Sequence, residues 1–230
     1  MKPIYRFFVQ PQINTDTKSI FGYELLMKQW TPEGWRLPES FSAIDPQIIA
    51  DLLVESTRVL SLKVRYCSVN VSREQLMTTS IAAAIIKSQE QLYPTKLTVE
   101  LTEDDGPQKY TIAELLPQLK TFLSKGMQLS LDDVGTGDNY FNEIQDLLPL
   151  VSEVKFALQN FNKQFKDPNI QKKIHFWHAI SQEYGLRMVL EGIEDHEDNQ
   201  LSKQLGIKLK QGYYFSRPQL LKLPQDAQLA

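Results

Sequence analysis

The stretch KLTVELTE, Lys96–Glu103, alternates apolar and polar residues. Because successive side chains of a strand point to opposite faces, Leu97, Val99 and Leu101 share one face of this stretch. The other face carries Thr98, Glu100 and Thr102. The pattern predicts a strand with one apolar surface and one polar surface that bears a carboxylate.

Three further segments alternate in the same way: VRYCSVNVS (64–72), MQLSLDD (127–133) and RMVLEGIE (187–194). In a doubly wound sheet, helices cover both faces and both faces are apolar. One apolar and one polar face instead favours a closed barrel with helices outside and a polar site inside. Other short apolar segments, including YRFFVQP (5–11), EVKFAL (153–158) and YYFSRP (213–218), read as strands between longer amphipathic segments. The sequence therefore predicts an α/β fold, a (β/α)8 TIM-like barrel.

Capping residues mark the expected helix boundaries. Asp45 followed by Pro46 is typical of a helix start, and Thr111 with Glu114 forms a possible capping box. Pro117 lies inside the second of these patterns, where it predicts a kink or a restart of the helix. The glycines expected to end helices in a left-handed conformation are Gly126, Gly185 and Gly206.

Composition limits the classes of function. The chain has 230 residues and a net charge of −3, which argues against binding DNA or RNA polymers through a broad basic surface. Lys2, Pro3 and Arg6 interrupt the opening, so we expect no signal sequence there, and no apolar run approaches the roughly 20 residues that span a bilayer. The single Cys67 cannot form an internal disulfide, which fits a reducing compartment. We expect one domain over residues 1–230 of a cytoplasmic protein without membrane contact.

Polar residues stand near the ends of the expected strands at a regular interval, on average about 31 residues apart, as in barrels of eight βα units. They are Glu24, Asn70, Glu100, Asp132, Lys155, Glu191 and Gln211. Strand ends of such a barrel meet at one mouth, so these side chains can share one site. Asp132 and Asp133 are adjacent and repel each other, so either they form an ordinary polar turn or a cation lies beside them.

The order of these motifs resembles the EAL domain family over nearly the whole chain, from about Tyr5 to Pro218. Glu24, Leu25 and Leu26 stand where the family has Glu-Ala-Leu. The matching segments are FVQPQI (8–13), GYELLMK (22–28), SVNVS (68–72), VELTE (99–103), LDDVGTG (131–137), VKFAL (154–158), LEGIED (190–195) and QGYYFSRP (211–218). The resemblance implies a TIM-like barrel, often with an antiparallel first strand, and a homodimer. It also implies two Mg²⁺ or Mn²⁺ ions and hydrolysis of cyclic di-GMP to linear pGpG.

The resemblance further implies roles for individual residues. The expected metal ligands are Glu24, Asn70, Glu100, Asp132, Asp133 and Glu191, an oxygen-rich set that suits magnesium or manganese. The expected catalytic residues are Lys155, which orients the attacking water, Glu103, which steadies the glycine-rich loop, and Glu194, the second acid of LEGIED. The expected cyclic di-GMP contacts are Gln10, Leu26, Lys28 and Gln211. Asp132 would bridge the two ions, which would relieve its repulsion with Asp133.

The chain departs from the family pattern at several positions. Ala157 replaces the aspartate of Lys-x-Asp, a loss that often accompanies weak or absent hydrolysis, and Lys28 replaces an arginine. After the GTG of the loop, Asp138, Asn139 and Tyr140 replace the usual small residues. Two hypotheses therefore stand: a cyclic di-GMP phosphodiesterase, or a degenerate EAL module that binds cyclic di-GMP or a protein partner with little or no turnover. A third reading is an unrelated metal-dependent barrel enzyme.

Overall fold

Parallel strands alternate with helices through most of the chain. The computed structural model describes residues 4–102, 109–161, 165–224 and 226. The strands are β1 (Tyr5–Asn14), β2 (Ser19–Thr31), β3 (Gly34–Arg36), β4 (Tyr66–Ser72), β5 (Lys96–Thr102), β6 (Gln128–Leu131), β7 (Glu153–Ala157), β8 (Arg187–Glu191), β9 (Leu209–Lys210) and β10 (Gln219–Leu220).

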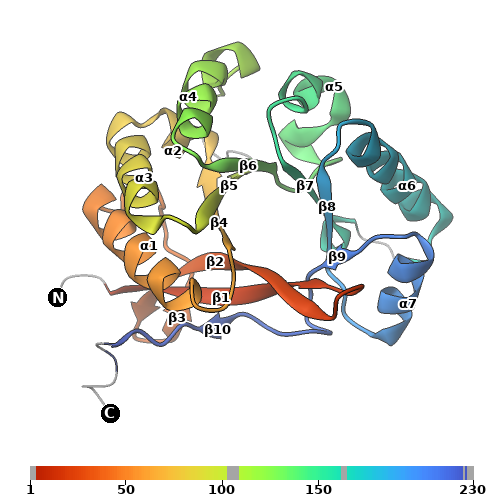
Figure 1. The fold of residues 1–230 in the computed structure, drawn as a ribbon, viewed down its shortest axis with the longest axis horizontal. Helices are drawn as coiled ribbons and strands as arrows, with labels where there is room; N and C mark the ends of the chain where they lie inside the picture. The colour runs from red at the N-terminus through yellow and green to blue at the C-terminus, as the bar shows by residue number, and fades with distance from the viewer. Residues whose placement is uncertain (1–3, 103–108, 162–164, 225, 227–230) are drawn as a thin grey trace.

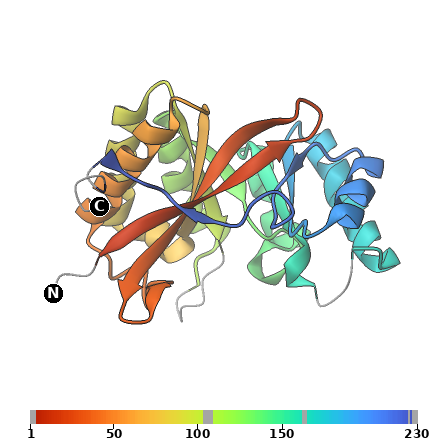
Figure 2. The same ribbon diagram turned by 90° about the horizontal axis from the view of Figure 1, so that it is seen from below.

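The barrel is closed by its first strand. From β2 through β4 to β9, neighbouring strands are parallel, whereas β1 runs antiparallel to both β2 and β9. Gln10 lies opposite Glu24 on one side of β1, and Ile13 lies opposite Lys210 on the other. Figure 2 shows the long β1 and β2 crossing the molecule between two groups of helices. The predicted (β/α)8 barrel is confirmed, including the antiparallel first strand.

Helices surround the parallel part of the barrel, and β3 and β10 extend the sheet beside β2 and β1 (Figure 1). The helices are α1 (Pro46–Leu60), α2 (Arg73–Met77), α3 (Thr79–Leu92), α4 (Ile112–Ser124), α5 (Phe141–Ile144), α6 (Pro168–Glu183) and α7 (His196–Gln204), with short 3₁₀ turns η1 (Gly137–Asn139), η2 (Gln145–Leu147) and η3 (Leu158–Asn160). Within the described ranges, no helix has both the length and the apolar character needed to cross a bilayer.

The predicted helix ends are confirmed. The Asp45 side chain accepts a hydrogen bond from the Gln47 N–H at the start of α1, and Thr111 and Glu114 form the capping box of α4. The three expected glycines follow their helices with positive φ. The helix does not restart at Pro117, because α4 is continuous through it. Pro117 and Ala113 are both exposed, so the Ala113 carbonyl that lacks an N–H partner can bond water instead.

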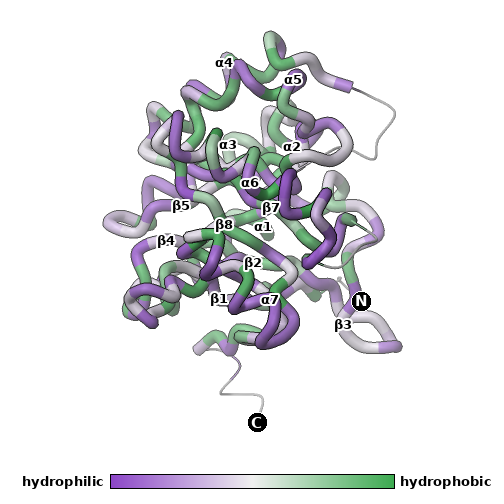
Figure 3. The backbone as a smooth tube through the Cα atoms, turned by 90° about the vertical axis from the view of Figure 1, so that its right-hand side faces the viewer, coloured by the Kyte–Doolittle hydropathy of each residue, from purple (hydrophilic) through white to green (hydrophobic). Residues whose placement is uncertain are grey.

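The alternation of the strands separates an apolar outer layer from a polar interior. Leu97, Val99 and Leu101 of β5 are buried in the core between the barrel and the helices. Thr98 and Glu100 are equally buried, but they point the other way, into the barrel. Figure 3 shows a different contrast, because the barrel strand β8 is mostly hydrophobic and the surface helix α7 is largely hydrophilic.

One predicted strand is wrong. The segment YYFSRP (213–218) forms turns, and the last barrel strand is the two-residue β9 just before it. The chain bends because Gly212 packs directly against the backbone of Ile193, where a Cβ would collide with the Ile193 carbonyl oxygen. The amide of Tyr214 then donates to that carbonyl. Gln211 is thereby fixed at the end of β9.

Candidate functional site

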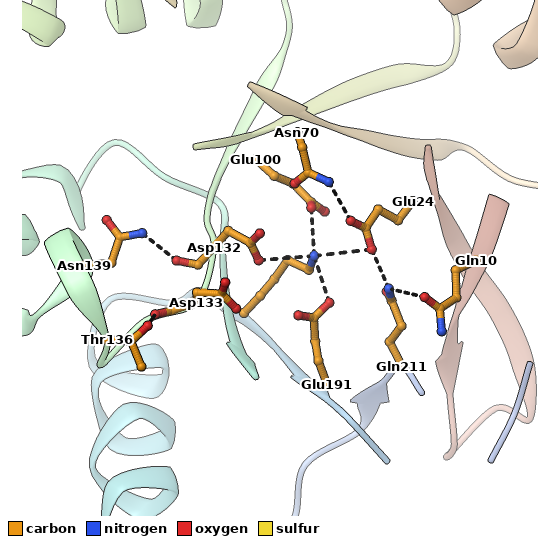
Figure 4. A network of polar contacts seen from close by, with 11 residues as sticks. Gln10, Glu24, Asn70, Glu100, Asp132, Asp133, Thr136, Asn139, Glu191 and Gln211 are labelled. Carbon is orange, nitrogen blue, oxygen red and sulfur yellow. Dashed lines mark hydrogen bonds and ion pairs between the residues drawn. The ribbon is translucent and has the colours of Figure 1, made fainter. Parts of the chain in front are cut away.

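Four carboxylates, three on strands β2, β5 and β8 and one directly after β6, surround one lysine inside the barrel (Figure 4). The ammonium Nζ of Lys155 on β7 lies 2.7 Å from Glu100 Oε2, 2.8 Å from Glu191 Oε1, 3.3 Å from Asp132 Oδ1 and 3.6 Å from Glu24 Oε2. The lysine side chain is 1% exposed. The strand-end acids that the sequence spreads over most of the chain therefore meet at one point.

Amide side chains fix the orientation of Glu24. Asn70 Nδ2 donates to Glu24 Oε1 over 2.7 Å, and Gln211 Nε2 donates to Glu24 Oε2. The same Gln211 amide lies 3.3 Å from Gln10 Oε1, so it also joins β1 to the end of β9. These contacts connect the two ends of the sequence at the site.

Burial and mutual repulsion perturb the acids. Burial raises the pKa of Glu191 to about 8 and that of Asp132 to about 6, although Lys155 opposes both shifts. Burial also raises the pKa of Glu100 well above its ordinary value. Burial alone would raise the pKa of Glu24, but Lys155, Gln211 and Asn70 together lower it. Burial alone would lower the pKa of Lys155, but the four carboxylates raise it well above its ordinary value, so the side chain is an ammonium.

The oxygen donors fit divalent cations. Asn70 Oδ1 and Glu100 Oε1 are buried and have no hydrogen-bond partner within the described part of the chain, where Asp132 Oδ1 has only its ion-pair contact with Lys155 Nζ, at 3.3 Å. Buried polar atoms almost always have a partner, so these under-satisfied oxygens fit a bound cation or a further hydrogen-bond donor. Asp132, Asp133 and Glu191 can also place one carboxylate oxygen each within 4.8 Å of one another. Such oxygen-rich sets suit Mg²⁺ or Mn²⁺.

The site opens into a pocket of about 310 Å³. Of the residues that the sequence singled out, the pocket wall includes Gln10, Glu24, Leu26, Asp132, Asp133, Lys155, Glu191, Glu194 and Gln211. Lys28 and Asn70 instead line an adjacent apolar pocket, which shares only Leu26 with the first. Glu100 lies behind Lys155, fully buried, and Glu103 lies outside the described residues.

Sequence reasoning missed Gln159 and Tyr213 in this wall. Gln159 lies on η3, directly after β7, and Tyr213 follows Gly212. Residues just past a barrel strand generally line its mouth, so the position of Gln159 after VKFAL was an available signal. Tyr213 was missed because the segment 213–218 was predicted to be a strand. The residue is 49% exposed, and the Arg217 guanidinium lies over its ring, 4.1 Å from the ring centroid.

Comparison with known families fits this geometry. The family model for the EAL domain matches residues 5–218. The chain belongs to the EAL domain family. Among curated relatives of this EAL domain, the cyclic di-GMP phosphodiesterase RocR of Pseudomonas aeruginosa is 25% identical over 93% of the chain and 57% of RocR. The probable cyclic di-GMP phosphodiesterase PdeD of Escherichia coli K12 is 24% identical over 95% of the chain and 42% of PdeD.

Solved structures show the same fold. A stand-alone EAL protein from Vibrio cholerae O395, in its c-di-GMP-bound form, has a TM-score of 0.76 and 21% identity over 95% of this chain and 94% of that protein. At this identity the likeness establishes the barrel alone. The EAL domain spans 57% of RocR and less than half of PdeD, so those relatives contain further sequence.

Proposed function

We propose that residues 1–230 act as a single EAL domain that hydrolyses cyclic di-GMP to linear pGpG with two divalent ions, Mg²⁺ or Mn²⁺. The observation that carries this proposal is the set of buried carboxylate and amide oxygens beside one ammonium, of which Asn70 Oδ1 and Glu100 Oε1 have no hydrogen-bond partner among the described residues. The names of RocR and PdeD support the substrate. The pocket in front of the oxygens is large enough for part of a dinucleotide, at about 310 Å³.

The metal ligands would be those implied by family resemblance, namely Glu24, Asn70, Glu100, Asp132, Asp133 and Glu191. Bound divalent ions would polarise a phosphodiester and favour an ionised water nucleophile. Burial, and then repulsion from neighbouring carboxylates, raises the pKa values of Asp132 and Glu191. A bound cation would favour the ionised carboxylates and so offset both effects. One carboxylate oxygen each of Asp132, Asp133 and Glu191 lie within 4.8 Å of one another, which supports the bridging role that the resemblance implies for Asp132.

Other side chains would hold water and substrate. Lys155 would direct its ammonium protons toward the acids and a water beside them, which orients that water for attack on phosphorus. Gln211 and Gln10 present amide groups at the pocket wall that can bond phosphate or base edges. Leu26 supplies an apolar contact. Glu194, exposed at the rim, and Glu103 would have supporting catalytic roles, as the resemblance implies.

Lys28, in the wall of the adjacent apolar pocket, would place its ammonium beside a phosphate of the ligand. Lysine retains the charge of the usual arginine but not its two-pronged geometry, so this contact would be weaker. We further propose a cytoplasmic protein that acts as a homodimer, with cyclic di-GMP as its ligand and no DNA, RNA polymer or membrane as a partner.

A second candidate is a cyclic di-GMP receptor or protein-interaction module with little or no turnover. Ala157 favours it. This residue is buried at the end of β7, shares the inward face with Lys155, and lies in register with Glu191. The inner wall thus has a methyl group where the family pattern has a carboxylate beside the metal site.

Incubation of the purified chain with cyclic di-GMP and Mg²⁺ or Mn²⁺ distinguishes the two candidates. The phosphodiesterase produces pGpG, detected by chromatography, and Glu24→Ala abolishes that product because it removes a ligand held by two amides. Ligand binding without product under both metals identifies the receptor. Full activity in Glu24→Ala would show that the metal site is wrongly assigned.

A further inference from the structure

A buried amide holds the main chain of Asp132. Asn139, at the end of η1, is 0% exposed, and its Nδ2 donates to the Asp132 carbonyl oxygen over 2.6 Å (Figure 4). On its other side, Asn139 Oδ1 accepts a hydrogen bond from an Arg73 NH2 group over 3.2 Å. The Asn139 side chain therefore links Arg73 of α2 to Asp132, the first residue after β6.

Arg73 holds the same loop at a second point. It is the first residue of α2, 7% exposed, and its NH2 group also donates to the Asp138 carbonyl over 3.2 Å. Its Nε has no hydrogen-bond partner among the described residues. Burial of a guanidinium against neutral oxygens costs free energy. Among the described residues, the two oxygens that accept from Arg73 both belong to this loop, so the arginine anchors the loop to α2.

The loop also controls the second aspartate. Asp133 has φ +50°, a left-handed conformation that few residues other than glycine adopt. Thr136 Oγ1 donates to the Asp133 carbonyl over 2.7 Å, which supports this conformation. Each aspartate is thus held by a loop side chain at its carbonyl, while its carboxylate remains free to face the pocket. Asp132 Oδ1 lies 3.3 Å from Lys155 Nζ as a result.

We propose that Asn139 and Arg73 are positioning residues that set the orientation of the Asp132 carboxylate for metal binding. The proposal rests on the proposed function, since it assumes that Asp132 is a ligand. Groups that hold a metal ligand by a hydrogen bond typically change metal affinity about 10- to 100-fold when they are lost. A purely structural role would change stability and leave metal affinity unaltered.

Asn139→Asp removes one contact of the Asn139 side chain and keeps the other. The new carboxylate has the same shape and still accepts from Arg73, but it cannot donate to the Asp132 carbonyl. Mn²⁺ binding to the full chain is measured by electron paramagnetic resonance of the free ion, and kcat and KM are measured with cyclic di-GMP. We expect Mn²⁺ affinity to fall by about tenfold or more, and kcat to fall at saturating cyclic di-GMP while KM stays within about twofold.

Asp138→Asn is the matched control. It changes an adjacent residue of the same loop, whose carboxylate pairs with Lys109 Nζ over 2.8 Å at the surface. We expect its Mn²⁺ affinity to equal that of the wild type. Arg73→Gln keeps the hydrogen bond from Asn139 to the Asp132 carbonyl but removes the guanidinium that donates to Asn139 Oδ1. It should therefore weaken Mn²⁺ binding by a smaller factor, about fivefold.

The outcomes are distinct. Wild-type affinity in a folded Asn139→Asp overturns the inference, as does an equal loss of affinity in Asp138→Asn. Should Asn139→Asp fail to fold, Arg73→Gln decides, and unchanged Mn²⁺ affinity in that variant overturns the inference. Failure of the wild-type chain to bind Mn²⁺ overturns the proposed function instead.

Discussion

Lys155→Met tests the charge balance of the site without any substrate. The change keeps a long unbranched side chain but removes the ammonium that contacts Glu24, Glu100, Asp132 and Glu191. All four carboxylates are nearly buried, so the variant leaves them without their shared cation. We expect the metal-free protein to lose much of its stability.

The magnitude follows from the geometry. At an effective dielectric constant of about 20, each contact near 3 Å corresponds to a gross attraction of about 5 kcal/mol, most of which desolvation offsets. Removal of one partner from a buried ion pair costs a net of about 3–5 kcal/mol. For a chain of this size that loss lowers the melting temperature by about 6–20 °C. Mn²⁺ at 100 times its Kd should restore about 2.7 kcal/mol, because it supplies the missing positive charge.

Thermal unfolding followed by circular dichroism, with chelator and then with Mn²⁺, measures both effects. Lys210→Met is the matched control, since Lys210 is the other fully buried lysine in the described ranges but donates to the carbonyl and side-chain oxygens of Asn199. A melting temperature of Lys155→Met within about 2 °C of the wild type in chelator would refute the reasoning. An equal loss in Lys210→Met would refute it too.

Two further predictions concern single residues. Ala157→Asp adds a carboxylate to the inward face of β7 beside Lys155. The rate of pGpG production at saturating Mn²⁺ should rise about tenfold, which corresponds to an activation barrier lower by roughly 1.4 kcal/mol. Unchanged turnover would show that Ala157 does not limit the reaction. Burial, assisted by Lys203 and opposed by Asp16, lowers the pKa of Lys210 to about 8. In the unfolded chain the same lysine has a pKa of about 10.4, so between pH 8 and 10 the unfolded state binds more protons than the folded state. The free energy of unfolding of the wild type should therefore rise with pH over this range, relative to that of Lys210→Met. Urea unfolding at several pH values measures the difference in free energy of unfolding between the two proteins, and a difference that does not change with pH would contradict the prediction.

Much of the fold could be predicted from local patterns. The alternation around Thr98 and Glu100 places polar groups inside a barrel because a strand has only two faces, and helix caps such as that of Asp45 are local chemistry. The segment 213–218 was misread because its aromatic residues suit a strand, whereas the close contact between Gly212 and Ile193 that bends the chain is long-range. Pro117 was misjudged because the exposure of its helix face, which lets water replace the lost hydrogen bond, is not visible locally.

The site was predictable as a set of strand-end acids but not as a geometry. That Lys155 lies among four carboxylates depends on how the strands are staggered around the closed barrel, which spacing along the chain does not specify. The link from Arg73 through Asn139 to Asp132 joins an α2 residue to a loop that follows two strands later. Hydrogen bonds of this kind require coordinates.

The antiparallel first strand has a consequence for how the protein is made. Gln10 and Glu24 leave the ribosome early, but their partner Gln211 is 201 and 187 positions further along the chain. A nascent chain that stops short of β9 has nearly all of the acids and lacks the strand that seals the seam between β1 and β8. The pocket can therefore form only after β9 has been synthesised, and cation capture would report that the ring of strands has closed.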